Sequence, residues 1–131
     1  MTEPLLKKPK VNKFMGQHID QKVKIRVKRN SCTRIIPINE ILYIKANSPY
    51  AQMYLEDGSN IFCSESIKYF DNKLSHYNFY RIHRSYLVNI ESIKSVCNEG
   101  DGMVQINDGS KIKMARGKKN IVLTLLDDKY L

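Results

Sequence analysis

Several features that would place this chain in a specialised class are scarce or missing. Its 131 residues include no Trp and only three cysteines. No apolar run approaches the roughly 18 residues that indicate a membrane-spanning helix. Residues 1–17 carry lysines and two prolines instead of the apolar stretch of a signal peptide. We therefore expect a soluble, cytoplasmic protein.

The cysteines give no sign of a disulfide framework. Cys32, Cys63 and Cys97 lie about 30 residues apart, without CxxC spacing, and their number is odd. We expect reduced, mostly buried thiols. The hydrophobic fraction of 42% and the eight tyrosines argue against disorder, and a chain of this length suits one domain that folds without metals or disulfides.

Acidic residues are too few to balance the basic ones, and the net charge is +9. Residues 1–30 hold nine Lys or Arg against Glu3 and Asp20, a net of +7, so everything after them nets only +2. Lys and Arg that neutralise phosphates supply the sequence-independent part of nucleic-acid binding. A solvated basic leader on an ordinary fold would give the same total, so charge alone does not decide the function.

The pattern along the chain predicts mostly β-structure after a basic leader. Residues 1–21 contain prolines and lysines without a sustained period, which indicates a flexible linker or arm, and the domain is expected over residues 22–131. Residues 22–28 alternate polar and apolar, as a strand with one buried face does. Short β-branched runs follow at 35–38 and 41–44.

Two later segments have the design of β-hairpins. Residues 50–55 and 60–63 flank one Asp-Gly turn, and residues 103–106 and 111–114 flank another. Asp-Gly favours a tight type I′ turn, which predicts antiparallel partners in each case. Between the hairpins, residues 64–74 begin with capping residues and space their apolar positions as a short helix does. The apolar run 120–126 fits a helix or a strand, and we favour a helix.

The sequence lacks the constellations that catalysis, metals or cofactors need. Carboxylates are scattered through turns, and His83-Arg84-Ser85 has no identifiable third partner. No second His or Cys stands at ligand spacing from His83, so a packed structural histidine is expected there. Residues 98–102 lack the spaced ligands of a calcium loop and read as a β-turn. We expect no enzyme, metal or cofactor.

One segment carries the function. Residues 79–90 read FYRIHRSYLVNI, in which an aromatic residue, Arg, His-Arg-Ser, two mostly apolar positions, Val and Asn follow one another from Tyr80 to Asn89. This string resembles the LytTR family of DNA-binding domains from bacterial response regulators. The resemblance extends from about Lys22 to Leu126 and includes the polar loop after residues 41–44 and the late Arg116.

The resemblance implies an elongated stack of small, mainly antiparallel β-sheets with one or two short helices. It also implies sequence-specific binding of double-stranded DNA by loops inserted into major grooves, in a transcriptional regulator or its DNA-binding domain in the bacterial cytoplasm. A receiver or sensor domain usually precedes such a domain. The alternative from the residues alone is a β-rich RNA-binding or protein-interaction module with exposed tyrosines.

By resemblance, the base-reading positions are Tyr50, Asn89 and Arg116. Arg can donate two hydrogen bonds to guanine, and Asn can pair with adenine in the same bidentate way. Without the resemblance, an Asn after a strand is more often a turn residue that bonds its own backbone. Pro49 stiffens the first loop, where the family more often has a flexible polar residue, and it weakens the case for Tyr50.

Five further side chains have the charge or hydroxyl group that holds phosphates: Arg84, Ser85, Lys118, Lys119 and Ser48. Each of them could equally be solvated surface. Ala115 stands where the family often has a Ser, which removes one phosphate donor. Because a single small module contacts few base pairs, we expect two copies on repeated half-sites.

Overall fold

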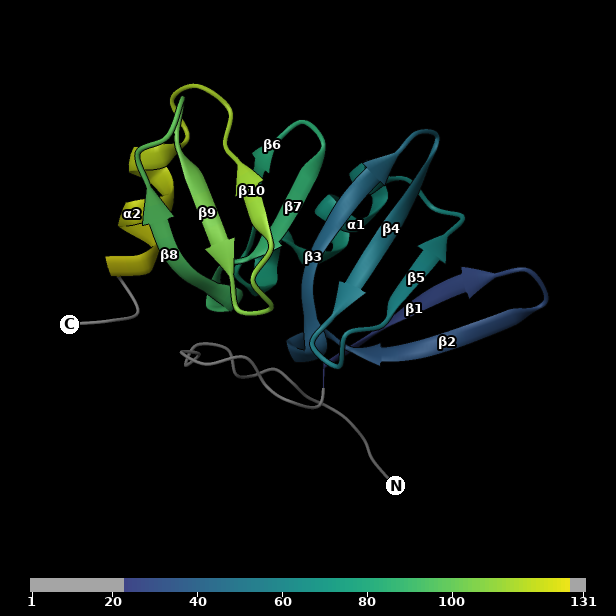
Figure 1. The fold of residues 1–131 in the computed structure, drawn as a ribbon. Helices are drawn as coiled ribbons and strands as arrows, with labels where there is room; N and C mark the ends of the chain where they lie inside the picture. The colour runs from purple at the N-terminus through teal and green to yellow at the C-terminus, as the bar shows by residue number, and fades with distance from the viewer. Residues whose placement is uncertain (1–22, 128–131) are drawn as a thin grey trace.

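The computed structural model describes residues 23–127, which form three antiparallel sheets and two short helices (Figure 1). The strands are β1 (Lys24–Arg29), β2 (Cys32–Pro37), β3 (Ile41–Asn47), β4 (Tyr50–Leu55), β5 (Asn60–Cys63), β6 (Phe79–His83), β7 (Tyr86–Asn89), β8 (Ile93–Cys97), β9 (Met103–Ile106) and β10 (Lys111–Lys113). The helices are α1 (Ile67–Leu74) and α2 (Lys119–Asp127). The mostly-β prediction is confirmed, whereas the predicted leader, residues 1–21, lies outside the described residues.

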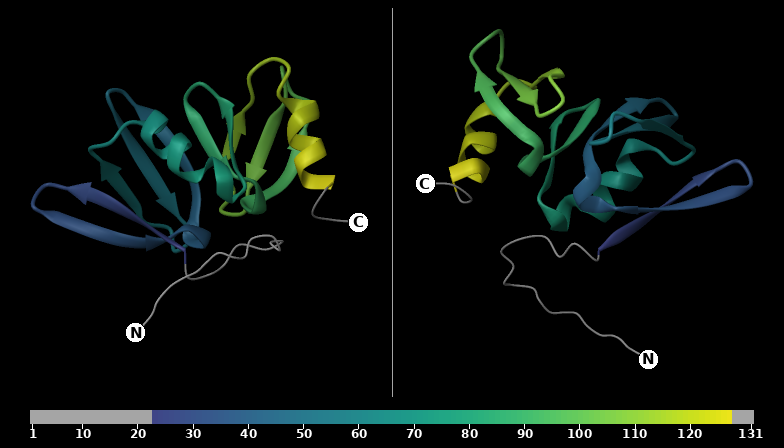
Figure 2. Two further views of the ribbon diagram at one scale, coloured as in Figure 1. Left: turned by 180° about the vertical axis from the view of Figure 1, so that it is seen from behind. Right: turned by 60° about the horizontal axis from the view of Figure 1, so that its bottom comes forward.

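The central sheet has the strand order β5-β4-β3-β7-β6, and the smaller sheets are β1-β2 and β10-β9-β8. Figure 2 shows the β1-β2 hairpin and α1 towards one end of the molecule and the third sheet with α2 towards the other. Two apolar cores result. One joins the β1-β2 hairpin, α1 and one face of the central sheet, and the other joins the opposite face, the β8–β10 sheet and α2. This arrangement is the predicted stack of small sheets.

Strand β3 lies in the middle of this stack and is buried on both faces. Its pairing with β4 shifts register between Ile41 and Tyr43, and such a bulge changes the alternation of side chains along a strand. Ile41 and Ile44 therefore enter the first core, whereas Leu42 and Tyr43 enter the second. The continuous apolar run at 41–44 follows from burial on both sides.

The two Asp-Gly hairpins form as predicted, but their turns differ from the predicted type I′. A type I′ turn needs positive φ at both central residues, and here only the glycines have it, with φ of 92° at Gly58 and 93° at Gly109. Each glycine N–H donates to the last residue of the preceding strand, Leu55 or Ile106. These are three-residue loops that end in a left-handed glycine. The aspartates brace them by accepting hydrogen bonds from the serines that follow.

Both helices lie where the sequence placed them. The Ser66 side chain caps α1 by accepting from the N–H of Tyr69, and Phe70 and Leu74 bury the apolar face. The run at 120–126 is helical, as we favoured, and Val122 is its buried anchor. The cysteines are free, but the expectation of mostly buried thiols is wrong for Cys32, which is exposed near the β1-β2 turn; Cys63 is buried and Cys97 is half-buried.

Gly102 fixes the β8-β9 connection. Its N–H donates to the Glu99 carbonyl and its own carbonyl accepts from the N–H of Met114, both at 2.9 Å. Its φ is 113°, and a Cβ here would lie 2.7 Å from the Met114 side chain. Gly100 in the same loop has a φ of 59°, with open space around it.

We predict that Gly102→Ala lowers the free energy of unfolding by about 2 kcal/mol, since its backbone conformation is sparsely populated for residues with a Cβ. Gly100→Ala serves as the matched control and should cost about 1 kcal/mol, because its φ lies in the left-handed region that other residues tolerate. Urea denaturation measures both values. Equal losses would contradict the strain assigned to Gly102.

Candidate nucleic-acid interface

Four connections lie together along one edge of the molecule, at the top of Figure 1: β3-β4, β6-β7, β8-β9 and β10-α2. The reverse view in Figure 2 shows the same alignment. We call this row the loop edge. It brings together seven of the eight predicted site residues, which are Ser48, Tyr50, Arg84, Ser85, Arg116, Lys118 and Lys119. Asn89 lies at the far end of β7 and does not belong to it.

The β6-β7 connection is a tight turn at Arg84 and Ser85. The Ser85 N–H donates to Nδ1 of His83 at 3.1 Å, and the Ser85 carbonyl accepts from the N–H of Ala46 on β3 at 2.8 Å. The guanidinium of Arg81 donates to the Arg84 carbonyl. The backbone of the turn is therefore held from both sides, while the Arg84 side chain is exposed at its apex.

Asn89 is a structural residue in this chain, which corrects its predicted base-reading role. The side chain is only 4% exposed. Its Nδ2 donates to the Ile41 carbonyl at 2.9 Å, and its Oδ1 accepts from the N–H of Glu91 at 3.0 Å. Both ends of the amide are thus bonded inside the protein. The turn-residue interpretation, which the residues favour without the family resemblance, describes its geometry.

Arg116 stands on the β10-α2 connection, and its side chain is 92% exposed. The preceding residue ties the loop to the sheet, because the N–H of Ala115 donates to the Ile82 carbonyl at 2.8 Å. The N–H of Lys118 closes the turn on the Ala115 carbonyl at 3.1 Å. A fixed backbone therefore presents an exposed guanidinium, which matches what base contact requires.

Sequence reasoning missed one neighbour of Arg116. Nε of Arg116 lies 3.9 Å from the carboxylate of Asp101 on the β8-β9 connection. Both side chains are exposed, so the ion pair stabilises the free protein little. The contact still leaves the two terminal nitrogens of the guanidinium unused by Asp101. Fifteen positions separate the two residues, and only the pairing of β8, β9 and β10 brings them together.

The two lysines after Arg116, Lys118 and Lys119, lie where the β10-α2 connection enters α2. Nζ of Lys118 lies 3.3 Å from the Tyr80 hydroxyl and 5.4 Å from the ring centroid. Lys119 is the first residue of α2, and both lysines are half-buried. The ammonium group of Lys118 is therefore held against Tyr80, near the start of β6, and Asp101 is the acidic neighbour of Arg116.

The β3-β4 connection carries Ser48 and leads into Tyr50. Ser48 is exposed in the turn, and Tyr50 is 43% exposed at the start of β4. The Tyr50 ring packs edge-on against Phe62 with 5.3 Å between centroids. Phe62 thus contacts the Tyr50 ring on one side, and the rest of the ring is exposed.

His83 behaves as the packed structural histidine that we expected. Its Nδ1 accepts the Ser85 N–H, and its ring lies 5.7 Å from that of Tyr86. Desolvation lowers the pKa of His83, and the charges of Lys113, Arg84 and Arg81 lower it further. Within residues 23–127, no three His, Cys, Asp or Glu side chains gather as a metal site.

We predict that Asn89→Ala lowers the free energy of unfolding by about 1–3 kcal/mol, because it leaves the buried carbonyl of Ile41 without its donor. Asn72→Ala, on an exposed position of α1, is the control and should change stability by less than about 0.5 kcal/mol. Chemical denaturation compares the two. A loss no larger than that of the control would refute the structural role.

We also predict that the imidazole of His83 titrates below 6.5, its ordinary pKa in the unfolded chain. The folded state then binds fewer protons than the unfolded state, so its stability contribution is present above pH 6.5 and falls as the pH drops towards the folded pKa. An NMR titration measures the midpoint. Lys113→Gln should raise it, since Lys113 is one of the cations that lower it; an unchanged midpoint would argue against that coupling.

Comparisons with known proteins agree with the geometry. The model of the LytTr DNA-binding domain family matches residues 31–127. A solved LytTr DNA-binding domain of a methyl-accepting/DNA response regulator from Bacillus cereus has the same fold, with a TM-score of 0.67 and 20% identity. The match covers 80% of this chain and 97% of that one. The comparison with curated proteins found no match.

Among residues 23–127, neither helix has the length or apolar character to cross a membrane. The family model spans well over half of the sequence, and the solved domain has the same fold. The chain therefore belongs to the LytTr DNA-binding domain family, and it is a non-enzymatic DNA-binding domain of the kind found in transcriptional regulators.

Proposed function

We propose that the domain binds duplex DNA sequence-specifically through the loop edge, with its connections inserted into successive major grooves. The observation that carries the proposal is that residues 48–50, 84–85 and 116–119, which are far apart in sequence, end up along one edge of the fold. Their guanidinium, ammonium and hydroxyl groups are donors suited to base edges and phosphates. Ser48, Tyr50, Arg84 and Arg116 are exposed, and the other donors are half-buried. Such binding places the protein in the cytoplasm, where bacterial DNA lies.

Arg116 is the first base-reading residue in this proposal. Its guanidinium is exposed, and the contact with Asp101 is made through Nε. The two terminal nitrogens can then donate side by side to O6 and N7 of a guanine. Arg84 is the second base-reading residue in this proposal and replaces Asn89 in that role. Its long side chain is exposed at the apex of the β6-β7 hairpin, to which Asn89 also belongs.

The remaining members of the loop edge hold the phosphates. Ser48 and Ser85 offer hydroxyl groups in the β3-β4 and β6-β7 turns. Lys118 and Lys119 offer ammonium groups where the β10-α2 connection enters α2. Phosphate contacts of this kind fix the register of a protein on the duplex. Tyr50 stays a base-reading candidate because Phe62 holds its ring at the end of the first loop.

Binding of two copies to repeated half-sites is part of the proposal. One loop edge presents two exposed arginines and one tyrosine, which can discriminate only a few base pairs. A second copy on a neighbouring half-site multiplies the discrimination of the first. Analytical ultracentrifugation with duplexes that carry one or two half-sites measures the stoichiometry.

Selection of bound duplexes from a random pool at near-physiological salt tests the proposal. We expect one enriched motif. Arg116→Ala should relax the preference at one base position, at a cost of about 1–3 kcal/mol there. Lys119→Ala, as the control, should weaken all sequences alike and lower the salt dependence by about one charge. Asn89→Ala should select the same motif as the unmodified chain.

Two results would contradict these assignments. Failure to enrich any motif would refute sequence-specific binding. Uniform weakening of all sequences by Arg116→Ala would move Arg116 from the base-reading group to the phosphate-holding group. The same comparison applies to Arg84→Ala, for which we expect the loss of preference at a second, separate base position.

A further inference from the structure

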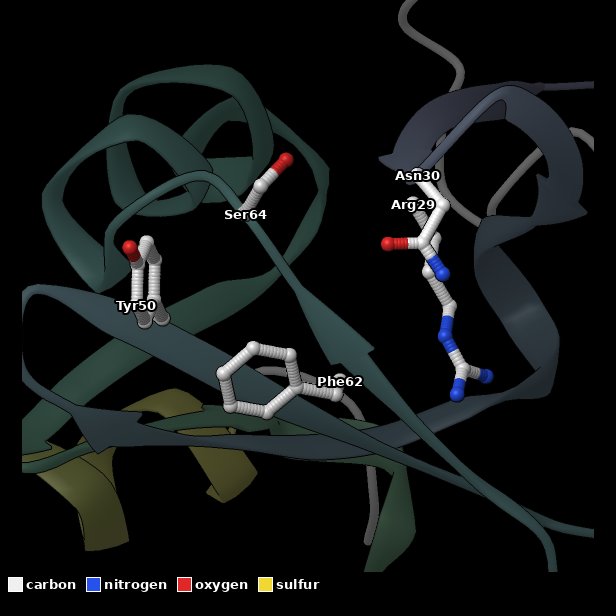
Figure 3. A pocket seen from close by; sticks show the side chains of 5 residues that line it. All are labelled: Arg29, Asn30, Tyr50, Phe62 and Ser64. Carbon is white, nitrogen blue, oxygen red and sulfur yellow. The ribbon is translucent and has the colours of Figure 1, made fainter.

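A hollow of about 370 Å³ lies beside the β3-β4 end of the loop edge, between the tip of the β1-β2 hairpin and the central sheet. Figure 3 shows Arg29 and Asn30 on the hairpin side, with Tyr50, Phe62 and Ser64 on the sheet side. We infer that this hollow binds the sugar-phosphate backbone of the same duplex beyond the bases that the loop edge reads. The inference rests on the proposed function and extends its footprint.

The alternation of side chains along β1 explains why Arg29 lies at the hollow. Ile25 and Val27 occupy the inward-facing positions of β1 and are buried, and Arg29 is the next residue on that face. At Arg29 the hairpin has passed beyond the core, and the side chain is exposed. Arg29 therefore does not pack against the apolar core, although it lies on the inward face of β1. Its side chain lines the hollow instead.

The walls of the hollow are held at a fixed spacing. The Lys28 carbonyl accepts hydrogen bonds from Oγ of Ser64 at 3.2 Å and from its N–H at 3.5 Å, which ties β1 to the end of β5. The edge-on contact between Tyr50 and Phe62 forms the opposite wall. The site therefore needs little ordering when a ligand enters, and this lowers the cost of binding.

The lining suits a phosphodiester. It offers a guanidinium, an amide and a phenol as donors, while the Ser64 hydroxyl already donates to the Lys28 carbonyl, and none of its five residues is acidic. Its two aromatic rings provide an apolar surface for a deoxyribose. The acidic residue next in sequence, Glu65, is half-buried at the start of α1 and offsets part of the positive charge without lining the hollow.

Continuity with the loop edge identifies the partner. Tyr50 lies at the end of the β3-β4 connection and also lines the hollow. A duplex that follows the loop edge and continues past Tyr50 reaches Arg29. Small molecules prefer more enclosed and more apolar sites than this open hollow, and phosphate contacts next to a base-reading surface are a general feature of DNA recognition.

Fluorescence anisotropy of the full chain with its selected duplex, measured over a salt series, tests the inference. Arg29→Ala should make the negative slope of log K against log salt shallower by about 0.9, the value expected for the loss of one phosphate contact. It should also weaken selected and scrambled duplexes by the same factor. Arg29→Lys should keep the slope. Trimming the duplex at the end that faces the hairpin should abolish the difference between the unmodified chain and Arg29→Ala.

Arg34→Ala is the matched control. Arg34 is an exposed arginine of the same hairpin, but it lies outside the hollow, where its charge acts on the Asp57 carboxyl. Equal slopes for Arg29→Ala and Arg34→Ala would overturn the inference. If Arg116→Ala still changes the selected motif in that case, the proposed function stands and only this extension of the footprint fails. If no duplex is selected at all, the proposed function itself fails.

Discussion

The arrangement of the whole domain depends on how the carbonyls at the start of β3 are satisfied. The bulge between Ile41 and Tyr43 interrupts the ladder, and the buried side chains of Asn89 and Ser92 donate to the carbonyls of Ile41 and Leu42. An unpaired buried carbonyl would cost about 1–3 kcal/mol. These bonds join the end of β7 to β3 and allow β3 to supply side chains to both cores.

The loop edge is a consequence of that stack. Because neighbouring strands run antiparallel, the connections β3-β4, β6-β7 and β8-β9 emerge at the same end, and the β10-α2 connection joins them. Backbone hydrogen bonds then join the neighbouring segments: Ala46 to Ser85, Ala115 to Ile82 and Met114 to Gly102. The loops are thus fixed relative to one another, and rigid loops can present donors in the register that a groove demands.

Charge is distributed more selectively than its total suggests. The described residues place exposed arginines at the apices of two connections and lysines on the flank of one, with Asp101 beside Arg116. The hairpin adds Arg29, which lines the hollow next to Tyr50. In DNA recognition, uniform positive charge gives affinity for any duplex, whereas fixed guanidinium groups discriminate between bases.

The sequence by itself determined the elements. The alternation of polar and apolar residues determined β1, and the Asp-Gly pairs determined two hairpins. Helix α1 followed from its capping residues and from the spacing of Phe70 and Leu74. The family was indicated by the string from Tyr80 to Asn89. These signals are local, so they can be read along the chain. Seven of the eight predicted site residues also stand on segments that form the loop edge.

Only the tertiary structure decided what each polar residue contacts. Asn89 has the side chain of a base-reading residue, but its amide donates a hydrogen bond to the Ile41 carbonyl, 48 positions away in the sequence. The pairing of β8, β9 and β10 brings Asp101 next to Arg116. Arg29 lines the hollow because the hairpin extends beyond the apolar core at this point. Burial and partners are set by contacts distant in sequence, which no local pattern encodes.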